Sequence, residues 1–183
     1  SKGSVDALQA FFENPDLSQY VVGWVPIQSP FYGTPVADFF NDNRFFNPLA
    51  IYILELIGGT SQVIGSLTQQ YRSQWLVDHK NEIANIGTKT RIVNFTSWKA
   101  REWNPFDTPL ALTRNAMERA GIQNDGLVPW RSGLLPGYPY VSTTRTDHLV
   151  PVMYSHAAWS YDRIRLTKTL MVLLTNRMPA SQY

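Results

Sequence analysis

The chain of 183 residues is 44% hydrophobic and 13% aromatic, a composition that can bury a sizeable core and excludes an intrinsically disordered protein. Its 16 Lys and Arg against 14 Asp and Glu leave a net charge of +2 without a basic cluster, which argues against a nucleic-acid partner. The absence of cysteine excludes disulfides, thiolate catalysis and cysteine-ligated zinc, and apolar runs such as residues 49–57 are too short for a transmembrane segment.

The first half of the chain predicts a helix, a strand and a long apolar helical region. Apolar residues at helical spacing predict a helix over residues 4–13, which an Asn-Pro pair ends. β-Branched and aromatic residues predict a buried strand over residues 20–27, and the Pro- and Gly-rich segment after it predicts a loop. From residue 47 to about residue 78 the pattern is helical and strongly apolar, with a break at the glycine pair 58–59.

The second half predicts two short strands and two helices. The strands are expected over residues 90–95 and 140–144, and a short helix over residues 113–120 ends at a glycine. Residues 156–178 predict an amphipathic C-terminal helix. The core positions expected on that helix are Ile164, Leu170, Val172 and Leu173. Strands that alternate with helices predict an α/β fold, but a parallel sheet of two or three strands cannot cover its own faces and edges. We therefore expect the chain to be part of something larger.

Ser1-Lys2-Gly3 is the first of three segments that could carry chemistry. A nucleophilic serine on a sharp strand-to-helix turn needs a small residue two positions later, and Gly3 meets that need. The helix that follows would point backbone N–H groups, the N–H of Lys2 first, at a developing oxyanion. An N-cap role for Ser1 explains the same pattern equally well.

Asp125 and His148 are the other two candidates. Asp125 lies in QNDGLVP, where an acidic residue can simply close a turn or can orient an imidazole. His148 lies in TDHLVP, where a histidine can be a buried structural residue or a general base. The chain order is Ser, Asp, His. This is the order of α/β-hydrolase triads, unlike the order in trypsin-like or subtilisin-like proteases.

These segments together resemble the C-terminal part of bacterial lipase- and esterase-type α/β-hydrolases, starting at the nucleophilic serine. The resemblance rests on Ser1-Lys2-Gly3, SPFYGTPVADF at residues 29–39, QNDGLV at residues 123–128 and DHLV at residues 147–150. It implies a single α/β-hydrolase-like domain over residues 1–183, built from the later strands and helices of a mostly parallel sheet. Residues 43–90 occupy the place of a helical lid or cap.

The resemblance also implies a site and a function. Ser1 would be the nucleophile, His148 the general base and Asp125 the carboxylate that orients it, in a serine hydrolase that cleaves carboxylic esters through an acyl-enzyme. Lys2 would give its backbone N–H to the oxyanion hole. The second oxyanion donor would come from an upstream segment of the same hydrolase, either in the same chain or as a cleaved companion, which is the partner we expect. The family favours a secreted or periplasmic location.

The sequence departs from the family at a calcium-binding position, and two other functions also fit it. Many of these lipases bind calcium through an Asp two residues after the histidine. Here that position is Val150, which cannot ligate a cation, so we predict no metal and no cofactor. One alternative is an amidohydrolase that uses Ser1 as an N-terminal nucleophile with its own amine as base. Another is a hydrolase-like structural chain without catalysis.

Overall fold

The computed structural model describes residues 1–42, 61–100, 110–152 and 161–176, in which helices alternate with short parallel strands. No helix within these ranges is both long and apolar enough to span a bilayer. The elements in chain order are α1 (Lys2–Glu13), the 3-10 helix η1 (Pro15–Gln19), β1 (Gly23–Trp24), α2 (Pro35–Asp42), α4 (Ser61–Ser66), α5 (Gln69–Asp78), α6 (Lys80–Ile86), β2 (Arg91–Ile92), β3 (Asn94–Trp98), α7 (Ala111–Arg119), the 3-10 helix η2 (Trp130–Gly133), β4 (Tyr140–Thr144) and α8 (Arg163–Thr175).

All strand pairs are parallel, and they join into one surface. β1 pairs with β2, β3 pairs with β4, and only Val93 separates β2 from β3 in the chain. A further parallel bridge between Ile27 and Phe95 continues the β1 pairing along β3. The β2–β3 segment therefore lies in the middle, between β1 and β4. Because parallel strands share one direction, the loops that follow Ile27, β3 and β4 leave the same edge of this surface.

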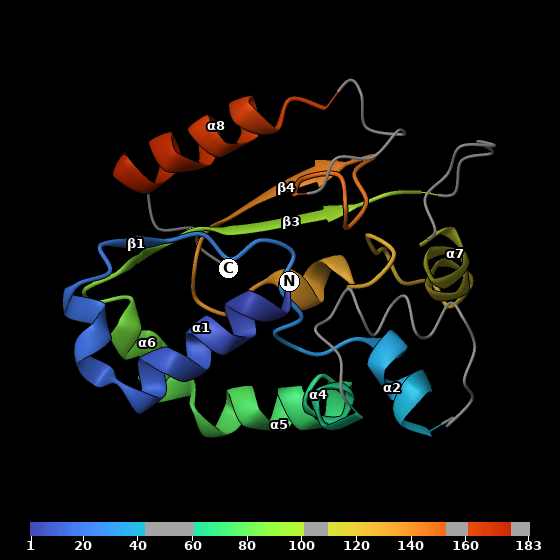
Figure 1. Ribbon diagram of the computed structural model, residues 1–183, viewed down its shortest axis with the longest axis horizontal. Coiled ribbons are helices and arrows are strands. Elements are labelled where there is room, and N and C mark those ends of the chain that lie inside the picture. The colour runs from blue at the N-terminus through green and yellow to red at the C-terminus, as the bar shows by residue number, and fades with distance from the viewer. Residues whose placement is uncertain (43–60, 101–109, 153–160, 177–183) are drawn as a thin grey trace.

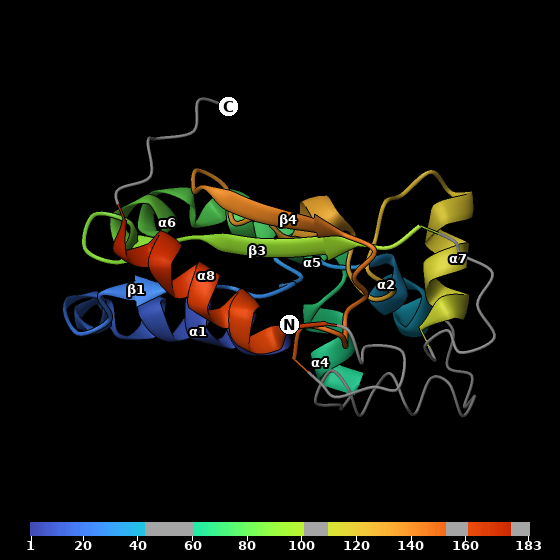
Figure 2. The ribbon, with the colours of Figure 1, turned by 90° about the horizontal axis from the view of Figure 1, so that it is seen from above.

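Helices cover both faces of the strands, and the main core lies on the α1 face. Figure 1 shows α8 above the strands and α1, α5 and α6 below them, and Figure 2 shows α8 crossing over them. Helix α1 forms because its apolar residues recur at helical spacing, and Val5, Leu8 and Phe11 are buried as the pattern predicts. Complete burial of a side chain such as Leu8 contributes about 2 kcal/mol. The core around it also contains Phe31, Ala37, Ile64, Leu67, Leu76, Ile83, Ile86, Ile92 and Leu135.

A second, smaller core supports the loops at the carboxyl edge of the strands. It contains Val36 from α2, Leu110 and Met117 at α7, and three loop residues, Leu127, Val128 and Leu149. Two of these loop residues follow Asp125 closely, and the third follows His148. This core therefore fixes the two loops that carry the predicted acid and base.

The α/β class with parallel strands is confirmed, whereas part of the predicted C-terminal core is wrong. Ile164 is 70% exposed and Val172 is 53% exposed, because α8 turns Leu170 and Leu174 toward the sheet instead. The first strand is also shorter than predicted, since regular pairing is limited to Gly23–Trp24 and the later bridge at Ile27.

The predicted lid at residues 43–90 falls partly outside the described residues, because residues 43–60 are not among them. The described remainder forms α4, α5 and α6, and their buried residues belong to the same core as α1. The lid assignment stays a prediction. The start of the predicted C-terminal helix, residues 156–160, likewise lies outside the described residues.

Candidate active site

Asp125 lies in a tight loop after α7 and is 1% exposed. Its Oδ1 accepts hydrogen bonds from the backbone N–H groups of Leu127 (3.0 Å) and Val128 (2.7 Å), so the loop closes around one carboxylate oxygen. Gly126 has φ 103°, and a Cβ at this position would lie 2.8 Å from the Cβ of Leu110. Only glycine fits there without strain. The turn interpretation of the NDG motif is therefore right, and it leaves Oδ2 available for a second task.

His148 follows β4, and its imidazole contacts the second carboxylate oxygen of Asp125. Its Nδ1 lies 2.8 Å from Asp125 Oδ2, and its backbone N–H donates to the Asp125 carbonyl at 2.8 Å. Because an ionised carboxylate only accepts hydrogen bonds, Nδ1 carries the hydrogen and Nε2 keeps the basic lone pair. The pair is buried, with His148 5% exposed. None of the described residues forms a hydrogen bond with Nε2.

Ser1 lies at the start of α1, and its nitrogen donates to the carbonyl oxygen of Ile27 at 2.7 Å. Burial lowers the pKa of the Ser1 amino group, and the Asp125 carboxylate partly opposes this. Gln28, the residue after Ile27, donates a hydrogen bond to the Asp147 carbonyl, so contacts through Ile27 and Gln28 connect Ser1 with the loop that carries His148. Among the described contacts, no hydrogen bond joins Ser1 to His148. The structure thus brings Asp125 and His148 into direct contact and Ser1 into their neighbourhood.

The side chain of Ser1 makes no capping hydrogen bond to α1, so the N-cap alternative for this serine gains no support. Lys2 is the first residue of the helix. The N–H of a first helical residue has no partner within the helix, and the Lys2 ammonium forms an ion pair with Asp6 at 2.6 Å. A Cβ at Gly3 would meet no described atom within 4 Å. The described residues therefore do not supply the crowding that the sequence argument expected at this glycine.

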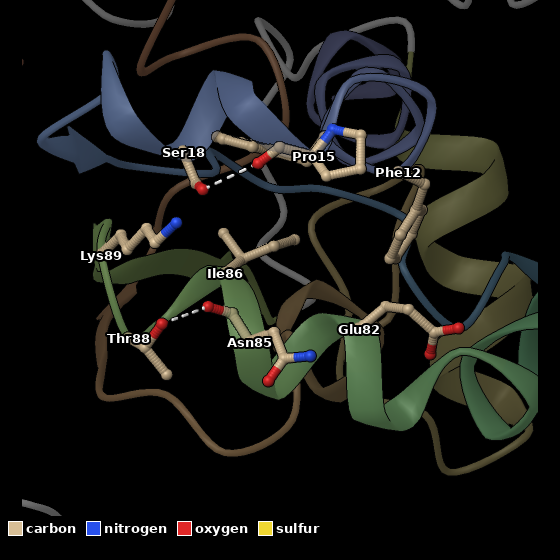
Figure 3. Close-up of a pocket in the computed structure, with 9 residues that line it drawn as sticks. Phe12, Pro15, Ser18, Glu82, Asn85, Ile86, Thr88 and Lys89 are labelled. Atoms are coloured by element: carbon tan, nitrogen blue, oxygen red, sulfur yellow. Dashed lines mark hydrogen bonds between the residues drawn. The ribbon is translucent and has the colours of Figure 1, made fainter.

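A cavity of about 500 Å³ lies at the opposite edge of the strands, between the end of α1 and α6 (Figure 3). Figure 3 shows the apolar side chains of Phe12 and Ile86 and the charged side chains of Glu82 and Lys89 among the residues that line it. The complete lining is Phe11, Phe12, Pro15, Ser18, Glu82, Asn85, Ile86, Thr88 and Lys89. The candidate acid, base and nucleophile are not in this set, so the cavity is separate from the candidate active site.

Sequence comparison identifies no relative, since no protein-family model and no curated protein matches the chain. Comparison with solved structures does show the fold. The described elements have the fold of α/β-hydrolase chains that are named lipases and esterases, at a sequence identity of 20%. At this identity the likeness establishes the arrangement of the chain and not its activity.

Three of these structures are informative. The mature form of the lipase BlEst2 from Bacillus licheniformis matches with a TM-score of 0.71 over 95% of this chain and 62% of its own. Its propeptide form gives a TM-score of 0.71 over 100% of this chain and 36% of its own. The metagenomic carboxyl esterase MGS0156 gives a TM-score of 0.73 over 96% of this chain and 54% of its own. The chain thus spans between about one third and two thirds of the length of these solved chains.

One buried residue beside the candidate site was missed by the sequence analysis. Gln28, directly after Ile27, is 1% exposed, has φ 47° and reaches the loop that carries His148. Glutamine is ordinarily a surface residue, and the groups that Gln28 contacts are 69 and 119 residues away in the sequence. No local pattern could have identified it.

Proposed function

We propose that the chain carries the catalytic residues of a serine hydrolase that cleaves carboxylic esters. The observation that carries the proposal is the buried contact between His148 Nδ1 and Asp125 Oδ2. Ser1, at the amino end of α1, is connected with the loop of His148 through the hydrogen bonds of Ile27 and Gln28. A buried imidazole with an ionised partner on one nitrogen and no described partner on the other is the arrangement that activates a hydroxyl nucleophile.

The reaction follows the usual acyl-transfer steps. Ser1 Oγ attacks the ester carbonyl carbon while His148 Nε2 takes the hydroxyl proton, and a tetrahedral oxyanion forms. The C–O bond to the alcohol then breaks, and the proton on Nε2 leaves with the alcohol. Water attacks the resulting acyl-enzyme with His148 again as base, which releases the acid and restores Ser1. Asp125 keeps the imidazole in the required tautomer throughout, because its oxygen accepts the Nδ1 hydrogen.

The oxyanion would be stabilised by the backbone N–H of Lys2. This group lies in the first turn of α1, where N–H groups lack helical partners and the helix dipole favours negative charge. Each such donor contributes about 10²- to 10³-fold to kcat in comparable enzymes. The second donor would come from an upstream segment.

The outer edge of β1 supports the proposal that an upstream segment pairs with this chain. The carbonyls of Val22, Trp24 and Pro26 accept from the β2–β3 segment, so the alternate residues of this strand direct their carbonyls to the other edge. There the carbonyl of Ile27 accepts from Ser1. A parallel strand that ends at Ser1 would continue this pairing, bring a neighbour close to Gly3 and cover an edge on which no strand of the described residues pairs.

Expression of residues 1–183 alone tests the upstream partner. We expect a chain that associates or unfolds without cooperativity, and co-expression with the upstream part should restore a cooperative urea transition. A soluble monomer of residues 1–183 with cooperative unfolding and esterase activity would contradict the proposal.

Labelling by a fluorophosphonate probe tests the nucleophile. The complete protein should gain the mass of one probe, on the peptide that contains Ser1, and should hydrolyse p-nitrophenyl butyrate. Ser1→Ala and His148→Ala should lose the label and at least about 10³-fold of kcat. His79→Ala is the matched control, because this histidine stacks on Trp75, and its described contacts do not include Asp125. A folded wild type that neither takes the label nor cleaves the ester would leave the non-catalytic alternative.

The amidohydrolase alternative predicts a different result. Burial lowers the pKa of the Ser1 amine, so the difference from an imidazole that a pH profile would have to detect becomes smaller. The His148→Ala variant separates them clearly. If the amine is the base, this variant retains most of its activity, whereas an imidazole base requires that nearly all activity is lost.

A further inference from the structure

We infer that Gln28 is a positioning residue for His148, an inference that rests on the ester hydrolase function proposed above. Gln28 follows Ile27, the residue whose carbonyl accepts from Ser1 at 2.7 Å. Its side chain runs from there to Asp147, the residue before His148. Gln28 therefore connects the strand end beside the proposed nucleophile with the loop that carries the proposed base.

Both N–H groups of the Gln28 amide are used. Nε2 donates to Ser97 Oγ on β3 at 2.6 Å and to the backbone carbonyl of Asp147 at 2.9 Å. Ser97 and Asp147 are both fully buried, and Gln28 is 1% exposed. Loss of the amide would leave the Asp147 carbonyl without a partner in a site from which bulk water is excluded.

The contact with Asp147 fixes one end of the peptide unit that leads into His148. The other end of this unit is the His148 N–H, which donates to the Asp125 carbonyl at 2.8 Å. A peptide unit is planar, so holding both of its polar ends fixes its rotation. The direction of the His148 side chain, and with it the place of Nε2, then follows. If Gln28 releases the carbonyl, the peptide can rotate and the His148 N–H opens more often.

The backbone of Gln28 supports a role for its side chain. A φ of 47° is the left-handed conformation, which costs a residue with a Cβ on the order of 1 kcal/mol and which glycine adopts freely. At this position glycine would remove the backbone strain but could not reach Ser97 or Asp147. A long polar side chain at a strained and buried position is thus explained by the two hydrogen bonds that it makes.

Two variants and one control, made in the complete protein, test the inference. Gln28→Met keeps the length of the side chain and removes the N–H groups. Gln28→Asn keeps an amide on a residue that tolerates the left-handed conformation better, but it is one methylene too short to reach both acceptors. Asn94→Leu is the matched control, because Asn94 is another fully buried amide, with Nδ2 donating to the Leu135 carbonyl at 3.2 Å at the opposite end of β3.

The expected result is a loss of kcat without a loss of substrate binding. Both Gln28 variants should lower kcat for p-nitrophenyl butyrate by about 10- to 100-fold with KM changed less than about threefold. Hydrogen exchange of the His148 backbone amide, measured by NMR, should accelerate at least about tenfold. Asn94→Leu, compared at equal folded fraction, should change neither quantity.

Two results would overturn the inference. One is a pair of Gln28 variants that keep kcat within about threefold and leave the His148 exchange rate unchanged. The other is an equal loss of kcat in Asn94→Leu, because Gln28 would then matter only for folding. If the proposed function is wrong, the wild type will neither hydrolyse the ester nor react with the fluorophosphonate probe. The exchange rate of the His148 amide can be measured in an inactive protein, so it still decides whether Gln28 holds His148.

Discussion

Replacing Asp125 by asparagine separates the two tasks of its carboxylate. The new amide keeps an oxygen for the N–H groups of Leu127 and Val128, so the loop should stay closed. The loss of stability is then limited to one charge-assisted hydrogen bond, about 1.5–3 kcal/mol. The amide NH₂, however, now faces His148 Nδ1 and favours the tautomer that carries hydrogen on Nε2, which cannot take a proton from Ser1. We expect kcat to fall about 10⁴-fold, equivalent to about 5 kcal/mol of activation free energy.

The assay is p-nitrophenyl butyrate hydrolysis by the complete protein, with urea unfolding to confirm the folded state. Asp147→Asn is the matched control. Asp147 is equally buried, and its Oδ1 accepts from the N–H groups of Leu149 and Val150 at 3.0 Å, but the described hydrogen bond of the imidazole goes to Asp125 and not to this carboxylate. The control should lose less than about tenfold of kcat. If Asp125→Asn keeps more than a tenth of wild-type kcat, or if the control loses as much, the orienting role of Asp125 is wrong.

Three further predictions concern stability and can be measured by urea denaturation of the complete protein. Leu8→Ala should lower the free energy of unfolding by about 2–5 kcal/mol, because Leu8 is fully buried in the core, and a loss below about 1 kcal/mol would contradict that burial. Gly87→Ala should cost about 1–3 kcal/mol, because its Cβ would lie 2.4 Å from Tyr138 Cε1, and a neutral or stabilising effect would contradict this close approach. Arg72→Met removes the hydrogen bond from Arg72 Nε to the buried Phe31 carbonyl and the contact of the guanidinium with the Trp75 ring, but it also removes the cost of burial that lowers the pKa of Arg72 to about 10. Because these effects oppose each other, the loss of stability should stay below about 2 kcal/mol, and a larger loss would show that the contacts outweigh the cost of burial.

Local pattern predicted most of the elements, but it could not predict which side of a helix faces the core. Helix α1 was identified because its apolar residues keep a single helical face, and β4 because turn residues precede it and β-branched residues fill it. In α8, five consecutive apolar residues from Leu170 to Leu174 define no single face. Ile164 and Val172 were therefore assigned to the core by hydrophobicity alone, while only tertiary packing decides which side is covered.

The candidate site shows the same division between local and tertiary information. Asp125 and His148 lie in short segments with distinctive composition, so they could be found in the sequence, and the structure brings them into contact. Gln28 has no such segment around it. Its buried state depends on Ser97 and Asp147, which reach it only after the strands have assembled. Residues that support a site through long-range backbone contacts leave no local trace in a single sequence.

The double connection between Asp125 and His148 has a consequence for protein engineering. One hydrogen bond joins their side chains and another joins their backbones, so the two residues form a closed loop that contains η2 and β4. Insertions at the exposed position Gly137, where a Cβ would meet no described atom within 4 Å, change the length of that loop without altering the two hydrogen bonds that close it. The contact between Asp125 and His148 should therefore persist after such insertions. A ligand-binding domain inserted at Gly137 could then be used to make the proposed activity depend on that ligand.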